Sequence, residues 1–88
     1  MDYQYSVVRD YFFQNGNTLE ERLEEVATFL EYSNAKSFAL AIIKERIIPL
    51  PKEYGKLEII KSEKGKNPLY GEIVCAIYPE NRTIYEKY

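Results

Sequence analysis

The spacing of apolar residues changes along the chain and predicts different elements in its two halves. The longest uninterrupted apolar run, residues 38–43, lies in a segment without glycine or proline, with Phe38 and Ile42 near its centre. Ser33 or Asn34 can cap the start of this segment, and Pro49 prevents its continuation. We therefore predict a helix over residues 34–48 that is covered on more than one side.

A second helix is predicted just before it, from Leu19 to about Tyr32. Thr18 and Glu21 have the spacing of a capping box, which satisfies backbone donors at a helix start. The buried stripe of this helix repeats every three or four residues and comprises Leu19, Leu23, Val26, Ala27 and Leu30. Because the link over residues 32–34 is short, the two helices should be in contact.

Residues 3–13 alternate with a period of two and are rich in aromatic and β-branched residues, which favours a strand. Five of them also fit a helical stripe, so a first helix is the alternative: Tyr3, Val7, Val8, Tyr11 and Phe12. The following Asn15-Gly16-Asn17 accepts positive φ angles, and we expect the chain to turn there.

After residue 55 the period is that of strands. Residues 56–62, 69–78 and 82–88 are separated by turn-forming residues and predict a three-stranded antiparallel meander. In the middle strand the uncharged set should face the helices: Gly71, Ile73, Cys75 and Ile77. The opposite face would then carry Tyr70, Glu72, Val74, Ala76 and Tyr78.

These elements predict one domain over residues 1–88 with an α+β fold, in which two packed helices lie on an antiparallel sheet in the order β-α-α-β-β-β. If residues 3–13 form a helix instead, the order α-α-α-β-β of a winged helix results. Eighty-eight residues leave room for only a modest core.

The amino-acid composition argues against most known kinds of catalytic site. The chain has no histidine and one cysteine, Cys75, and its four glycines are isolated, so the usual general base, zinc ligands and phosphate loops are missing. We expect a protein that is not an enzyme and has no cofactor, no metal and no small-molecule substrate. It has no signal-peptide pattern and no apolar run long enough for a bilayer, so we expect a cytoplasmic protein without membrane contact.

Two surfaces are candidates for binding. The first is the predicted outer face of the meander. The chain has nine tyrosines and no tryptophan, and tyrosine suits a contact surface that is partly exposed to water. This face would join two strands, and its candidate protein-binding residues are Tyr70, Val74, Tyr78, Tyr85 and Ile60. It would suit a protein partner or self-association.

The second candidate follows from the order of two helices and a hairpin. The run Ala27, Leu30, Tyr32-Ser33, Ser37-Phe38 and Ile42 is similar in spacing to the helix-turn-helix half-motif of AraC-type activators, although Glu31 stands where that family has its turn glycine. The resemblance implies that the second helix enters the major groove, and by the order of the elements the following hairpin would form a lysine-bearing wing. The candidate DNA-binding residues are Asn34, Lys36, Ser37, Lys44, Lys61, Lys64 and Lys66.

The net charge is −2, but the charged residues are unevenly distributed along the chain. Residues 18–31 contain five glutamates and one arginine, whereas all eight lysines follow residue 35. We therefore favour a small non-catalytic interaction protein that occupies the surface of a larger protein. Its size is typical of a phage or mobile-element accessory protein, such as an inhibitor of a host defence nuclease. The alternative is a winged helix-turn-helix transcriptional regulator that binds DNA.

Overall fold

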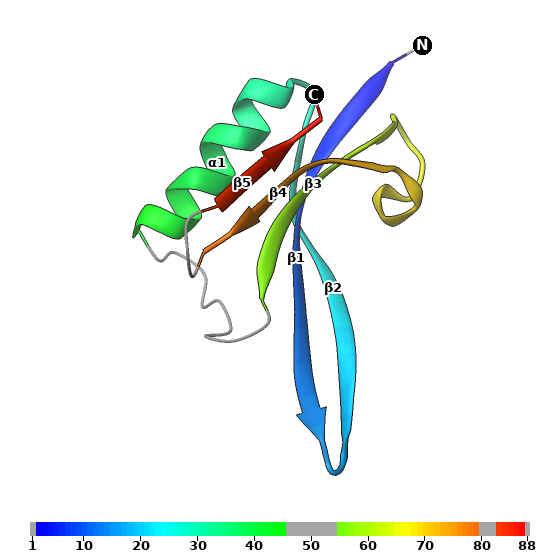
Figure 1. Cartoon of the computed structure of the whole chain (residues 1–88). Coiled ribbons are helices and arrows are strands. Elements are labelled where there is room, and N and C mark those ends of the chain that lie inside the picture. Colours follow the sequence, from blue (N-terminus) through cyan, green and yellow to red (C-terminus); the bar gives the residue numbers. More distant parts are fainter. Residues whose placement is uncertain (1, 46–54, 80–82, 88) are drawn as a thin grey trace.

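In the part of the chain that the structure describes, five strands form one antiparallel sheet and one α-helix packs on one of its faces (Figure 1). The computed structural model describes residues 2–45, 55–79 and 83–87. The strand order across the sheet is β2-β1-β3-β4-β5. The elements are β1 (Tyr3–Asn15), β2 (Thr18–Phe29), α1 (Tyr32–Glu45), β3 (Lys56–Glu63), the 3₁₀ helix η1 (Pro68–Tyr70), β4 (Glu72–Tyr78) and β5 (Thr83–Glu86).

The expected pair of packed helices is wrong, because residues 18–29 form strand β2 instead of a helix. They pair along their whole length with β1, from Asn15 opposite Thr18 to Tyr5 opposite Phe29. The Thr18 hydroxyl donates to the Asn15 carbonyl at 2.9 Å across the turn and does not cap a helix. Cross-strand pairing therefore overrides the local helical pattern.

The winged-helix alternative is also wrong. Residues 3–13 lie in strand β1, as the favoured reading predicted, and α1 is the only α-helix in the described ranges. It starts at Tyr32, directly after β2, so no preceding helix exists with which it could form a helix-turn-helix. The predicted end of α1 beyond residue 45 falls outside the described residues.

The core lies between α1 and the sheet. Ala35, Ala39 and Ile42 of the helix are fully buried against the sheet, whose strands contribute Val7, Ile59 and others. Phe38 is only half-buried and packs at the margin of the core, with its ring centroid 5.3 Å from that of Phe29. In the described part of the chain, no helix is both long and apolar enough to cross a membrane.

The meander of β3, β4 and β5 is present, but a β-bulge changes which β4 residues face the helix. Ile59 pairs with Cys75 and Ile60 pairs with Ile73, so Val74 is an extra residue in the ladder. Val74 joins the core together with Cys75 and Ile77, whereas Ile73 is exposed. The expected division of β4 into two strictly alternating faces is therefore wrong at these two positions.

Between β3 and β4 the chain folds back against the sheet through η1, which contacts both β3 and β2. A Cβ atom at Gly71 would lie 2.3 Å from the Lys61 carbonyl oxygen, so only glycine permits this close approach. We call the sheet face opposite α1 the outer face. Gln4 lies there and donates at 3.1 Å to both Ser62 Oγ and the Lys66 carbonyl.

The β1–β2 hairpin extends beyond the rest of the sheet. β1 pairs with β3 only from Tyr3 to Asp10, so the residues that follow pair only with β2. We call residues 11–22 the arm; in Figure 1 it points away from the helix and the other strands. Gly16 has a φ of 64° in its two-residue turn, a conformation that suits glycine.

Candidate functional site

The five residues predicted for protein binding do not form one surface. Tyr70 and Tyr85 are 88% and 63% exposed, and Tyr78 is half-buried. Ile60 and Val74 are buried, the latter in the core beneath α1, because the bulge in β4 turns it inward. Only the tyrosines therefore remain available to a partner.

Tyr78 and Tyr85 lie together on the outer face. Their ring centroids are 5.7 Å apart with the planes nearly perpendicular. The Lys56 ammonium lies 5.7 Å from the Tyr78 ring centroid, within reach of a cation–π interaction. This part of the predicted tyrosine surface is present.

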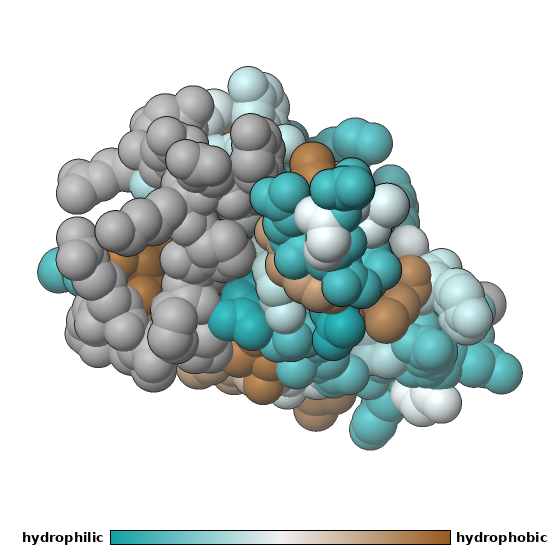
Figure 2. Space-filling view, turned by 90° about the horizontal axis from the view of Figure 1, so that it is seen from below, coloured by the Kyte–Doolittle hydropathy of each residue, from teal (hydrophilic) through white to brown (hydrophobic). Residues whose placement is uncertain are grey.

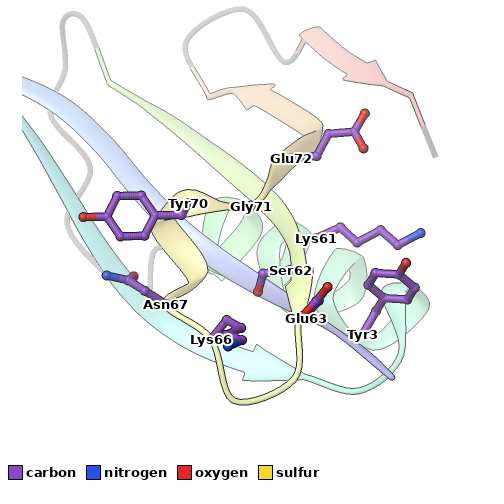
Figure 3. Close-up of a pocket in the computed structure, with 9 residues that line it drawn as sticks. All are labelled: Tyr3, Lys61, Ser62, Glu63, Lys66, Asn67, Tyr70, Gly71 and Glu72. Atoms are coloured by element: carbon purple, nitrogen blue, oxygen red, sulfur yellow. The ribbon is translucent and has the colours of Figure 1, made fainter. Parts of the chain in front are cut away.

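Tyr70 belongs to a different place, an open hollow of about 590 Å³ around Gly71 (Figure 3). Tyr3 and Lys61 lie side by side on one flank of the hollow, whereas Tyr70 points away from them. The Lys61 ammonium is 4.3 Å from the Tyr3 ring centroid. Because two lysines and two glutamates line this hollow, it has no single charge that would select a ligand.

The predicted DNA-binding residues are divided between α1 and the end of β3. Four of them are on α1: Asn34, Lys36, Ser37 and Lys44. Lys36 forms an ion pair with Glu86 of β5 at 2.7 Å. The other three, Lys61, Lys64 and Lys66, gather near the start of β1, where the Lys64 amide donates to the Asp2 carbonyl at 3.1 Å. Without a helix-turn-helix, this arrangement gives no recognition helix for a major groove.

The end of α1 near β5 is fixed by a polar cluster. The Tyr32 hydroxyl donates to Glu86, which also accepts from Lys36. These hydrogen bonds, from Lys36 first and then from Tyr32, lower the pKa of Glu86. Burial and the bond to Glu86 raise the pKa of Tyr32, and burial raises the pKa of the Cys75 thiol. Cys75 is thus a protonated core residue, as its apolar neighbours predicted.

A charged cluster crosses the outer face at the base of the arm. Asp10 pairs with Leu23 on one side and Lys56 on the other. The Lys56 ammonium lies 3.7 Å from Asp10 Oδ2 and 3.6 Å from Glu58 Oε2, and both carboxylates are buried. No group of three or more acidic or cysteine side chains in the described ranges is arranged to hold a metal ion.

Burial and charge set the protonation of this cluster. Burial is the main reason that the pKa of Asp10 is raised, with the Glu58 carboxylate adding to it. The hydrogen bond with Asp10 raises the pKa of Glu21 on the arm. Burial alone would lower the pKa of Lys56, but Glu58, Tyr78 and Asp10 together outweigh it and raise the pKa. Lys56 therefore stays charged between two buried acids.

The two faces of the arm differ in character. On the α1 side, Glu24 at its base accepts hydrogen bonds from Arg9 at 2.5 Å and Tyr11 at 2.7 Å. The bonds from Tyr11 and Arg9 lower the pKa of Glu24. The Arg22 guanidinium covers the Phe13 ring, with its Cζ atom 4.5 Å from the ring centroid. On this face, therefore, charged side chains pair with each other and with aromatic side chains across the two strands.

On the outer side of the hairpin, apolar side chains reach the solvent. Phe12 and Leu23 are each 40% exposed and Leu19 is 61% exposed. Their cross-strand partners in the register are Glu21, Asp10 and Gln14. Figure 2 views the molecule from below in Figure 1, toward the tip of the arm, and shows hydrophobic atoms emerging beside a mostly hydrophilic projection.

This apolar row is the functional candidate that sequence reasoning missed. Leu19 and Leu23 were predicted to lie on the buried stripe of a helix, and the strand places both in solvent. The available signal was the Gly16 turn directly after a segment, residues 3–13, that alternates with a period of two and could pair with the residues that follow the turn. Comparisons of this chain with protein-family models, curated proteins and solved structures find no match.

Proposed function

We propose that this protein is a non-catalytic binding module whose arm docks on the surface of a larger protein. One observation supports this most: the arm projects from the sheet with Phe12 and Leu19 substantially exposed on its outer side and Leu23 exposed at its base. A two-stranded ribbon is at best marginally stable by itself in water. A partner that covers these apolar side chains would bury surface that the chain itself leaves open.

The chemistry of the arm and its surroundings suits a protein partner. Tyr78 and Tyr85 lie on the same outer face as Leu23, beyond the Lys56 cluster, and aromatic rings are favoured in protein interfaces. The absence of histidine agrees with a role in binding rather than catalysis. An inhibitor that covers a basic working surface, such as that of a host defence nuclease, is the form of this function that an acidic arm fits.

The proposal is tested by affinity capture from the cells that produce the protein, with quantitative mass spectrometry. The arm variant carries Leu19→Thr and Leu23→Thr, which retain strand propensity but remove apolar surface. The matched control is Leu40→Gln, because Leu40 is 39% exposed on α1 and lies away from the arm. We expect a specific protein to be enriched by the parent and the control and at least tenfold less by the arm variant.

Two results would contradict the proposal. One is the recovery of the same protein at equal yield with the arm variant, which would place the interface elsewhere. The other is the absence of any specifically enriched protein from the parent chain.

A further inference from the structure

The outer edge of β2 is the longest free edge of the sheet. β2 is a terminal strand of twelve residues, and β1 is its only neighbour in the described sheet. A terminal strand presents unpaired backbone donors and acceptors along its outer edge, which another extended chain can use. Its side chains are exposed from Thr18 to Glu25, so no described residue covers that stretch of the edge.

The charges along this edge are strongly one-sided. Four glutamates are exposed on β2, two on each face: Glu20 and Glu24 on the α1 side, Glu21 and Glu25 on the outer side. Arg22 is the only cation in β2. Arg9 offsets Glu24 through its ion pair, so the excess negative charge rests on the other three glutamates. Directly opposite charges attract across neighbouring strands, so this edge favours lysine or arginine in a strand added to it.

The same charges oppose pairing of β2 with β2 of a second copy. In a two-fold antiparallel pair, residues equally distant from the axis lie opposite each other on the same face. With the axis at residue 22, Glu20 faces Glu24, and with the axis at residue 23, Glu21 faces Glu25. An axis at any of the four glutamates sets that residue against itself. Every register centred on residues 20–25 thus places at least one pair of like charges directly opposite, which is destabilising. The registers centred on Glu21 and Leu23 also set Arg22 opposite a glutamate, but neither pairs all four glutamates with a cation, as a basic strand would.

Resting on the proposed function, we propose that an extended, basic segment of the partner protein adds to β2 as a sixth strand. The side chains of β2 specify its pattern. Opposite Leu19 and Leu23 we expect apolar residues, and opposite Arg22 a neutral one. Opposite the glutamates we expect lysine or arginine. An antiparallel strand that runs from Glu25 back to Leu19 would read Lys-Lys-Val-Thr-Lys-Lys-Val.

The test uses the full chain and a capped synthetic peptide with two copies of this pattern. Binding is measured by calorimetry, and its location by amide hydrogen exchange in NMR spectra. We expect saturable binding that protects amides of β2 residues 18–25. We also expect binding to weaken as salt rises, because exposed charges are screened.

Two controls separate strand addition from simple charge attraction. Two N-methylated peptides keep the charge of the parent peptide. In one, the methyl groups replace the amide hydrogens that would face β2; in the other, they replace the amide hydrogens that would point away from it. We expect at least tenfold weaker binding for the first peptide and little change for the second. In the protein, Glu21→Lys with Glu25→Lys should weaken binding at least tenfold, whereas Glu63→Lys with Glu72→Lys, an equal charge change at exposed sites outside β2, should not.

Equal binding by both N-methylated peptides, protection outside β2, or no binding at all would overturn strand addition. So would a concentration-dependent dimer of the chain that protects β2 without peptide. These results are distinct from failure of the proposed function. If the arm variant no longer captures the cellular partner but the peptide does not slow amide exchange in β2, the arm docks on its partner by another geometry.

Discussion

At the base of the arm, two buried carboxylates and one lysine form an arrangement that is energetically unfavourable without the lysine. Asp10 and Glu58 are buried side by side on neighbouring strands, and Lys56 is the cation that lies between them. Burial of like charges is unfavourable unless a counter-charge accompanies them. The stability of this part of the sheet should therefore depend on Lys56 and on pH.

We predict that Lys56→Met lowers the free energy of unfolding by about 1–3 kcal/mol at pH 7, since it leaves buried carboxylates without their cation. Because the folded-state pKa of Asp10 is raised, its contribution favours folding at low pH and is lost as pH rises through that pKa. The loss caused by Lys56→Met should thus be smaller at pH 4 than at pH 7, because more of Asp10 is protonated at the lower pH.

Urea denaturation at both pH values measures this effect, with Lys44→Met as the control at an exposed lysine of α1. The pKa of Glu24 and that of Glu86 are lowered, so these carboxylates keep their charge, and their ion pairs, to a lower pH than ordinary glutamates would. An equal loss at both pH values would show that Lys56 acts through packing alone.

At the level of elements, the sequence predicted what each segment prefers locally but not which segments pair. Strand β1, helix α1 and the three meander strands were all expected near their observed positions. β2 was not, because Leu19 and Leu23 are four residues apart, a spacing that puts them on one face of a helix as well as on one face of a strand. A β-bulge also hides the alternation, since Val8 pairs with Glu25 and Val7 with Ala27, which leaves Val26 as an extra residue.

The candidate site was missed for the same reason. A helix over residues 19–32 would bury the leucines and expose the glutamates on its other side, whereas a strand exposes both on an edge. Phe38 shows the same limit within a correctly predicted helix. Phe38 and Ile42 were both expected near the centre of the apolar helix, but of the two only Ile42 is fully buried, together with Ala35 and Ala39. Burial depends on the partner surface, which local spacing does not specify.

The hairpin turn allows a prediction about the arm as an element. Gly16 has a positive φ, and nothing lies within 4 Å of a Cβ built on it, so substitution there acts through backbone strain alone. Gly16→Ala should destabilise the hairpin by about 1 kcal/mol, whereas Gly16→Asn should cost less, because asparagine tolerates this conformation. Amide exchange of residues 11–22 measures the difference. Identical exchange rates in both variants would indicate that the turn does not limit the opening of the arm.

On the scale of the whole molecule, shape and charge are both polarised. The protein extends over 44 × 26 × 21 Å, with the arm projecting from the rest of the sheet (Figure 1). The glutamates of β2 lie along the arm and its base, while Lys61, Lys64 and Lys66 gather near the start of β1. Such a field would orient a basic partner toward the arm during encounter.

The core implies that the remainder of the protein folds without the arm. None of residues 11–22 belongs to the buried cluster beneath α1. Tyr11 and Arg22 are directly paired, so replacing residues 12–21 with Asn-Gly would close a two-residue hairpin in the existing register. We expect the shortened chain to fold with a free energy of unfolding within about 1 kcal/mol of the parent's, because the shorter connection also reduces the loss of chain entropy.

Urea denaturation and small-angle X-ray scattering would measure the stability and the reduced length of this variant. The same variant should no longer bind the cellular partner or the basic peptide, because it lacks Leu19, Glu20 and Glu21 while Arg9, Asp10 and Glu24 remain in place. A folded, shortened chain that still binds the partner would move the interface to the body of the sheet. Failure of the shortened chain to fold would show that the arm is part of the cooperative core, contrary to the burial observed in the structure.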